Sequence, residues 1–455
     1  MRNILAGPRV SGELLFSRED LKRLLIPLLM EQALAVTIGM MDTVMVSGCG
    51  EASVSGVSLV DSINVLLIMV FSSLATGGSV VVSQFLGTRD RQRAGRAAKQ
   101  LYYVVLIASV AIMIPCLALR GPLLSGVFGS IEDEVMEAAL VYFLLTAMSY
   151  PFLAIYNGSA ALLRAVGDSK ATLKASIVMN LINVGGNALT IYGFGLGVTG
   201  AGLATLVSRI VGAAVVQIPL RRPECAIPYP DFRRVDWDGR LIRMILHIGV
   251  PNGLEGGMFQ LGKLVLLRMV ATFGTVSIAA NAVANTVATI QVLPGNAVSL
   301  AMITVVGRCV GAHAFDQARY YTRRLMLLAY GLMSALNILM LIGADLVVMP
   351  FSLSPETSAL AKRLFMLHGW GCVFLWPLSF TLPNALRAAG DTRFTMAVAS
   401  LSMLIFRVVF GYLLAQAMGL GVFGVWIAMQ IDWVCRIICF VLRFRSGKWE
   451  KMALV

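Results

Sequence analysis

Apolar and polar positions alternate along this chain on a scale of tens of residues. Apolar runs of about 20 residues recur from Leu24 to Phe440, and a helix of that length crosses a hydrocarbon core of about 30 Å. The pattern therefore predicts an all-α integral membrane protein. We predict twelve spans, at roughly residues 24–47, 55–84, 100–119, 137–160, 173–194, 197–219, 244–272, 278–306, 325–348, 364–385, 395–417 and 420–442.

The polar segments between these runs differ in charge. Lys and Arg gather after the second, fourth, sixth, eighth and tenth spans and in the C-terminal tail, whereas the loops after odd-numbered spans hold few of them. Since basic loops stay on the cytosolic side of a membrane, both termini are expected in the cytosol. That placement requires an even number of spans, which twelve satisfies.

The chain also repeats itself. LRAVGDSKAT at residues 163–172 returns as LRAAGDTRFT at residues 386–395, and GLGVTG at residues 195–200 returns as GLGVFG at residues 419–424. The nearly equal offsets of the two pairs indicate duplication of a six-span unit. We predict two parallel six-helix repeats that form two lobes around a central cavity. The lobes are residues 1–220 and 244–455, and residues 221–243 form a cytosolic linker.

Composition excludes several function classes. Hydrophobic residues make up 58% of the chain and charged residues 13%. The formal net charge of +13 lies in short clusters between apolar runs, so no nucleic-acid partner is expected. The seven cysteines form no CxxC pair, no GxxxxGK[ST] is present, and no spacing singles out a catalytic group. We therefore expect no enzyme, no cofactor and no metal site from these features.

One glycine motif calls for an explanation. Residues 193–200 contain a formal GxGxxG, which binds dinucleotides when it follows a strand and opens a helix of a βαβ unit. Here it joins two membrane spans. We interpret these glycines as a tight turn with close helix contact.

Polar residues inside the spans are the candidate functional groups. Asn180, Asn183 and Asn187 are spaced i, i+3 and i+7, so they share one side of the fifth span. Asp42 is the one acid among the mostly apolar residues 38–48 of the first span. An ionised carboxylate there costs about 3 kcal/mol or more unless it binds a proton or a cation. The alternative for each is a hydrogen bond between helices.

Further polar positions are candidates for lining a substrate cavity. Asp61 and Asn64 lie on the second span, Asn281 and Asn285 on the eighth, and Glu255 begins the seventh. These groups equally suit hydrogen bonds between helices, and Glu255 could instead neutralise Lys263 and Arg268 on its own helix.

Several motifs together resemble the multidrug and toxic compound extrusion (MATE) family of bacteria. They are Pro27, Gln32 and MDTVMV in the first span, N-x3-N leading into IYG in the fifth, GxxGAGxAT at residues 197–205, and the duplicated LRAxGD. The resemblance implies a secondary antiporter that exports organic, mostly cationic or amphipathic compounds in exchange for H+ or Na+. It further implies a multi-pass protein of the bacterial cytoplasmic (inner) membrane, and we expect a monomer.

The resemblance also implies a cation-coupling site. Carried onto this chain, the site consists of Asp42, Asn183, Asn187 and Thr205. Asn187 stands where the family has a second acid, which leaves one negative charge, weakens the expected affinity for Na+ and favours H+. Two rival functions stay open: a flippase for a lipid-linked precursor, and a membrane receptor or enzyme that does not transport.

Overall fold

The computed structural model describes residues 13–129 and 131–455, without the side chains of Met40 and Thr43. The start of the predicted N-terminal lobe, residues 1–12, lies outside this range. Within it, every regular element is a helix. The chain divides into two compact units. The N-terminal unit is Glu19–Gly253, and the C-terminal unit comprises residues 13–18 and Leu254–Val455.

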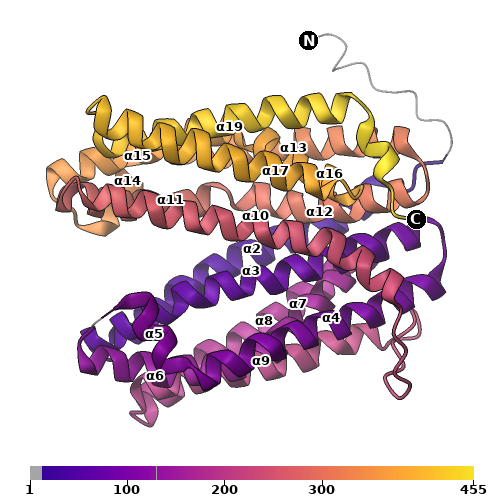
Figure 1. Ribbon diagram of the computed structural model, residues 1–455, viewed down its shortest axis with the longest axis horizontal. Coiled ribbons are helices and arrows are strands. Elements are labelled where there is room, and N and C mark those ends of the chain that lie inside the picture. The colour runs from indigo at the N-terminus through magenta and orange to yellow at the C-terminus, as the bar shows by residue number, and fades with distance from the viewer. Residues whose placement is uncertain (1–12, 130) are drawn as a thin grey trace. The chain divides into compact units, whose positions relative to one another are not determined.

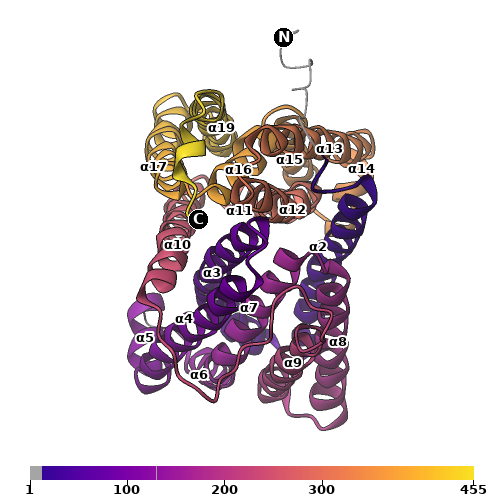
Figure 2. The same ribbon diagram turned by 90° about the vertical axis from the view of Figure 1, so that its right-hand side faces the viewer.

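The N-terminal unit is a bundle in which α3 packs against α4, α6 and α7, while α8 runs along α9 (Figure 1 and Figure 2). Its elements are α2 (Arg18–Ser47), α3 (Glu51–Gly87), α4 (Arg91–Ala118), α5 (Arg120–Phe128), α6 (Asp133–Met148), α7 (Tyr150–Val166), α8 (Ser169–Asn187), η1 (Ala188–Gly193), α9 (Gly197–Leu220) and the first part of α10 (Gly239–Ala271).

The C-terminal unit has a related arrangement, in which α12 packs against α13 and α16, and α11 against α15. Its aromatic core includes Trp376, Trp426 and Trp433. Its elements are the rest of α10, α11 (Thr275–Gln291), α12 (Leu293–Gly311), α13 (Phe315–Ile342), α14 (Ala344–Val348), η2 (Met349–Phe351), α15 (Pro355–Phe374), η3 (Pro377–Thr381), α16 (Leu382–Ala388), α17 (Thr392–Ser402), η4 (Met403–Val409), α18 (Phe410–Tyr412), η5 (Leu413–Ala417), α19 (Gly421–Arg445) and η6 (Lys448–Met452).

Residues 13–18 belong to the C-terminal unit because their backbone binds α13. The Tyr321 hydroxyl donates a hydrogen bond to the Phe16 carbonyl at 2.6 Å, and Gln317 Nε2 donates to the Glu13 carbonyl at 3.0 Å. The Phe16 and Tyr321 rings also meet edge to face. This segment therefore docks on a helix from the far half of the sequence.

The predicted all-α membrane fold is confirmed. Among the described residues, eight helices are long and apolar enough to cross a membrane, or ten if each of two bent pairs counts as one span. The bends are 47° between α6 and α7, and 64° between α15 and the segment that starts at Pro377. Pro151 and Pro377 explain them, because proline removes a backbone donor and clashes with the preceding turn.

Two of the predicted spans are less apolar than the others. The fifth lies in α8 and η1, where three asparagines interrupt the apolar run, and the seventh lies in α10, which carries Glu255, Lys263 and Arg268. Polar groups at these depths must face protein or water rather than lipid. The search for function therefore begins on α8 and α10.

The duplicated glycine turns have the predicted conformation. Gly195 and Gly419 both have positive φ, 66° and 69°, in the left-handed region that favours glycine. A Cβ added to Gly200 would lie 2.9 Å from Thr190, and one added to Gly424 would lie 2.8 Å from the backbone of the preceding helix. The GxGxxG segment is thus a tight turn followed by close helix contact, as interpreted from the sequence.

Candidate functional site

Asp42, the acid in the second half of the first span, is half-buried on α2 and bonds to the end of α8. Asn187 Nδ2 donates a hydrogen bond to Asp42 Oδ1 at 2.9 Å. Asn187 is the last residue of α8 and only 2% exposed. Two helices distant in sequence are therefore joined by one carboxylate and one amide.

Asn183 lies one helical turn before Asn187, between Asp42 and Thr205. Its amide approaches the Thr205 hydroxyl of α9 to 3.3 Å. With its nitrogen turned toward Asp42, the same amide donates to both carboxylate oxygens, at 3.0 and 2.8 Å, and leaves its oxygen free to accept from the threonine. The structure thus brings together Asp42, Asn183, Asn187 and Thr205.

The two orientations of the Asn183 amide suit different states of Asp42. With its nitrogen toward Asp42, both amides donate to the carboxylate, as an anion in a low dielectric requires. With its oxygen toward Asp42 and its nitrogen on Thr205, the same amide suits a protonated Asp42 or a cation bound between the two groups. Asn187 Oδ1 is buried and has no hydrogen-bond partner. One unused acceptor therefore lies beside the carboxylate, where a proton or cation would be held.

These four residues line a cavity of about 300 Å³ in the N-terminal unit. Asn180 and Asp61, both predicted from the sequence, line the same cavity. Asn180 Nδ2 also donates to Ser176 Oγ on its own helix at 3.2 Å. Other lining residues include Gly39, Val46, Val57, Tyr142, Ala201 and Arg209.

Asp61 begins a second hydrogen-bonded chain. Asn64 Nδ2 donates to Asp61 Oδ1 at 3.2 Å, and the Tyr150 hydroxyl donates to Asn64 Oδ1 at 2.9 Å. Asn64 is 3% exposed and does not line the cavity. The structure therefore gives Asn64 the role of positioning Asp61.

Arg209 is a functional candidate that the sequence reading missed. It lies on α9 one turn after Thr205, lines the cavity, and donates through Nη1 to Ser149 Oγ at 2.6 Å. The available signal was a single Arg inside the apolar sixth span. With Asp42 and Asp61 ionised, the charged residues that line the cavity sum to a formal charge of −1.

Glu255 has a structural partner that the sequence did not reveal. Arg387 Nη2 donates to Glu255 Oε1 at 2.6 Å, and the two side chains are 11% and 16% exposed. In the other repeat, Arg164 Nη1 lies 3.6 Å from Glu31 Oε1. Glu31 and Glu255 occupy equivalent positions of the two repeats, and both arginines come from the LRAxGD motif. The pairing repeats in both halves, so Glu255 joins helices there instead of neutralising charges on its own helix.

Asn281 and Asn285 line a different cavity, of about 260 Å³, inside the C-terminal unit. Trp426 Nε1 donates to Asn281 Oδ1 at 3.0 Å, and Asn285 Nδ2 donates to the Asn281 carbonyl at 2.8 Å. Glu255 does not line this cavity. The predicted substrate residues therefore divide between two cavities and one ion pair, except Asn64, which bonds to Asp61 from outside the cavity.

Comparison with known proteins matches nearly the whole chain. The family model MatE matches residues 27–189 and again residues 251–413, so the same model fits once in each repeat. The uncharacterized transporter YisQ of Bacillus subtilis (strain 168) is 28% identical over 431 residues, which cover 93% of each chain.

Two more distant likenesses agree with these matches. The probable multidrug resistance protein NorM of Thermotoga maritima is 24% identical and covers 96% of this chain, with 94% of its own length matched. A crystal structure described as MATE in the bent conformation superimposes with a TM-score of 0.88 at 21% identity. It covers 96% of this chain and 97% of that one.

Proposed function

Because this chain belongs to the MatE family of multidrug efflux transporters, we propose that it is a secondary antiporter that exports organic, mostly cationic or amphipathic compounds in exchange for H+ or Na+. The observation that carries the proposal is the carboxylate of Asp42, bonded to Asn187 and next to Asn183, in a cavity of net charge −1. In this proposal Asp42 is the coupling group, and Asn183, Asn187 and Thr205 hold it in place.

Charge balance supports competition between the coupling ion and the substrate. With Asp42 ionised, the cavity carries one uncompensated negative charge, which an organic cation would neutralise. When Asp42 takes up a proton, the charge falls to zero and the attraction for the cation is lost. Proton and cationic substrate therefore exclude each other from one cavity.

The driving force is sufficient without ATP. Exchange of one proton for one monovalent cation moves no net charge, so the pH gradient alone drives it, at about 1.4 kcal/mol, or roughly a tenfold concentration ratio, per pH unit. When the substrate is neutral, one elementary charge also moves through a potential of about 100 mV, which releases about 2.3 kcal/mol more. Movement of the two repeats between alternating states would expose the cavity to each side of the membrane in turn. The basic loops support cytosolic termini and location in the cytoplasmic membrane.

The single negative charge of the site favours protons over sodium as the coupling ion. Asn187 supplies an amide where the family has a second acid, which weakens the attraction for Na+. Asn187 Nδ2 faces Asp42, so this amide would have to rotate and give up its hydrogen bond before its oxygen could bind Na+. A proton needs only one oxygen of Asp42.

The direct test is the transport of ethidium by everted membrane vesicles, in which export appears as uptake into the vesicle lumen. We expect Asp42→Asn to abolish export, and Asp316→Asn, the same substitution in the first turn of α13, to leave it unchanged. Dissipating the pH gradient should stop export by the unaltered chain, whereas removing Na+ should not. Undiminished export by Asp42→Asn vesicles would overturn the proposal.

A further inference from the structure

The cavity in the C-terminal unit is the repeat counterpart of the Asp42 cavity. Of the ten residues that line it, eight stand at the repeat offset from a residue that lines the cavity of the N-terminal unit. The eight pairs are Gly39 and Lys263, Asp42 and Leu266, Val46 and Val270, Val57 and Asn281, Asp61 and Asn285, Asn183 and Arg407, Ala201 and Val425, and Thr205 and Met429. The fold has therefore built the same cavity twice.

The charge of the second cavity is reversed. Both acids are replaced, since Leu266 stands for Asp42 and Asn285 for Asp61. Lys263 and Arg407 take the places of a glycine and of Asn183. Within the described part of the chain, no acidic side chain lines this cavity, and two cations do.

Asp432, the acid next to Arg407, does not neutralise the positive charge of this region. It is fully buried and accepts from Arg436 Nε at 2.9 Å and from the Ser402 hydroxyl. Arg407 Nη1 lies 3.9 Å from its other oxygen, and Arg407 Nε is buried without a hydrogen-bond partner. Two guanidinium groups thus share one carboxylate, and Lys263 adds a third positive charge.

Three other acids of the C-terminal unit already have partners. Glu255 pairs with Arg387, Asp391 with Arg443, and Glu450 with Arg319. Among the described residues Lys263 forms no ion pair, and its ammonium lies over the Phe259 ring at 5.4 Å, where Arg407 lies at 5.1 Å. The excess positive charge therefore faces the cavity, where a bound anion would compensate it.

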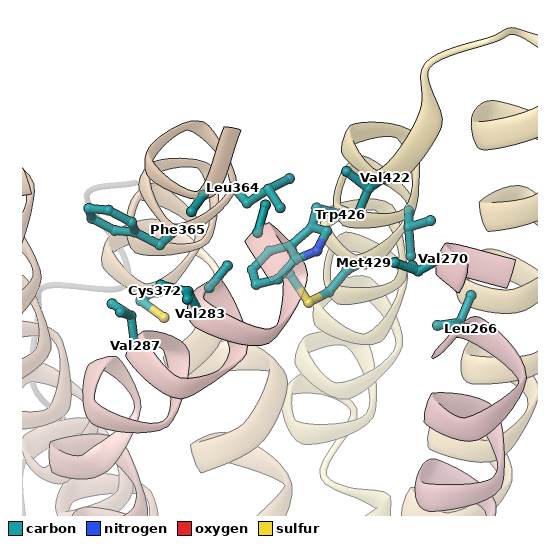
Figure 3. Close-up of a cluster of buried hydrophobic side chains, with 14 of the residues drawn as sticks. Leu266, Val270, Val283, Val287, Leu364, Phe365, Cys372, Val422, Trp426 and Met429 are labelled. Atoms are coloured by element: carbon teal, nitrogen blue, oxygen red, sulfur yellow. The ribbon is translucent and has the colours of Figure 1, made fainter. Parts of the chain in front are cut away.

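Apart from Asn281 and Asn285, the rest of the wall is apolar. Leu266 and Val270 of α10 and Trp426 and Met429 of α19 line the cavity. Figure 3 shows these four side chains within a cluster of buried apolar groups. The Trp426 indole nitrogen is held by Asn281, which fixes the ring against the cavity. The two cationic side chains and the aromatic Trp426 together suit a molecule that has an anionic group on a flat apolar body.

We propose that the C-terminal unit binds small aromatic organic anions, with Lys263 and Arg407 on the anionic group and Trp426 and Met429 against the ring. A volume of about 260 Å³ accommodates a two-ring compound. An anionic lipid headgroup shares this chemistry. A role of this site in export would rest on the proposed function, but the binding of an anion does not.

The test is equilibrium binding to the purified full-length chain in phosphatidylcholine nanodiscs, measured by titration calorimetry. Three probes of one shape are compared: 2-naphthoate, 2-naphthalenemethanol and 2-naphthylmethylammonium. We expect 2-naphthoate to bind at least tenfold more tightly than the other two. Equal binding of all three, or no binding of 2-naphthoate, would overturn the proposal.

Variants assign the binding to this cavity. Lys263→Gln should weaken 2-naphthoate binding about tenfold or more, because a charge-assisted contact is lost. Lys263→Arg should keep it, which separates loss of charge from misfolding. Arg268→Gln, exposed on the same helix and outside the cavity, should have no effect. Unchanged binding in a folded Lys263→Gln variant would refute the assignment.

Two further measurements separate the alternatives. Asp42→Asn should bind 2-naphthoate as the unaltered chain does, so this site and the proposed antiport can fail independently. Phosphatidylglycerol added to the nanodiscs should not compete. Loss of 2-naphthoate binding in those discs, at a salt concentration that screens surface charge, would instead assign the cavity to a lipid headgroup.

Discussion

Replacing Asn187 by Asp should convert the Asp42 site into a sodium site. Asn187 Nδ2 is 2.9 Å from Asp42 Oδ1, so the new carboxylate would place a second negative charge about 4 Å from the first. At that separation, and at an effective dielectric constant of about 20, the repulsion is about 4 kcal/mol. A cation between the two carboxylates would relieve it.

The repulsion sets the size of the expected effect. About 4 kcal/mol corresponds to roughly three orders of magnitude in affinity, which is an upper limit because the side chains and water adjust. We therefore expect Asn187→Asp to bind Na+ at least tenfold more tightly than the unaltered chain. The measurement is binding of radioactive 22Na+ to the purified protein at pH 8, where protons compete least.

A matched control comes from the same helix and the same cavity. Asn180→Asp adds the same charge, but Asn180 bonds to Ser176 and forms no hydrogen bond with Asp42. We expect a much smaller gain of Na+ binding there. If Asn187→Asp gains no affinity, or if Asn180→Asp gains as much, then the contact between Asn187 and Asp42 does not define the ion site.

Two further predictions concern the scaffold, and both are read as the melting temperature of the purified protein. Gly200→Ala should lower the melting temperature, because the added Cβ would lie 2.9 Å from Thr190. Gly185→Ala, whose Cβ would meet nothing within 4 Å, should change it little. Equal effects of the two substitutions would contradict the close helix contact. Glu255→Gln should destabilise the protein by about 3 kcal/mol because Arg387 loses a buried charged partner. The double variant with Arg387→Gln should be less destabilised, and strictly additive effects would contradict the ion pair.

Features that depend on chain periodicity could be predicted from the sequence. Apolar runs of membrane length indicated the helices, and motifs repeated at a nearly constant offset indicated the duplication, which the two MatE matches reproduce. The glycine turns were also predictable, because left-handed backbone and close contact both require glycine there. These are properties of short segments.

Partners across helices could not be predicted in the same way. The sequence singled out Glu255 as a charge in an apolar run, but its partner Arg387 is far away along the chain and comes from a motif that looked like a loop alone. Arg209 was overlooked for a similar reason. A charge inside a span shows that a partner or water is needed, while the way the helices pack decides which partner it is.

The comparison of the two halves separates scaffold from function in this chain. Equivalent positions that join helices keep their chemistry, as Glu31 and Glu255 do, since both halves must pack in the same way. Equivalent positions that face the cavities differ, since Asp42 corresponds to Leu266 and Asn183 to Arg407. The C-terminal half packs with a leucine where the N-terminal half has Asp42, so the bundle does not require a charge at this position. The reversal of charge between two otherwise matched cavities therefore supports ligands of opposite charge. A chain with both cavities would then handle organic cations in one half and organic anions in the other.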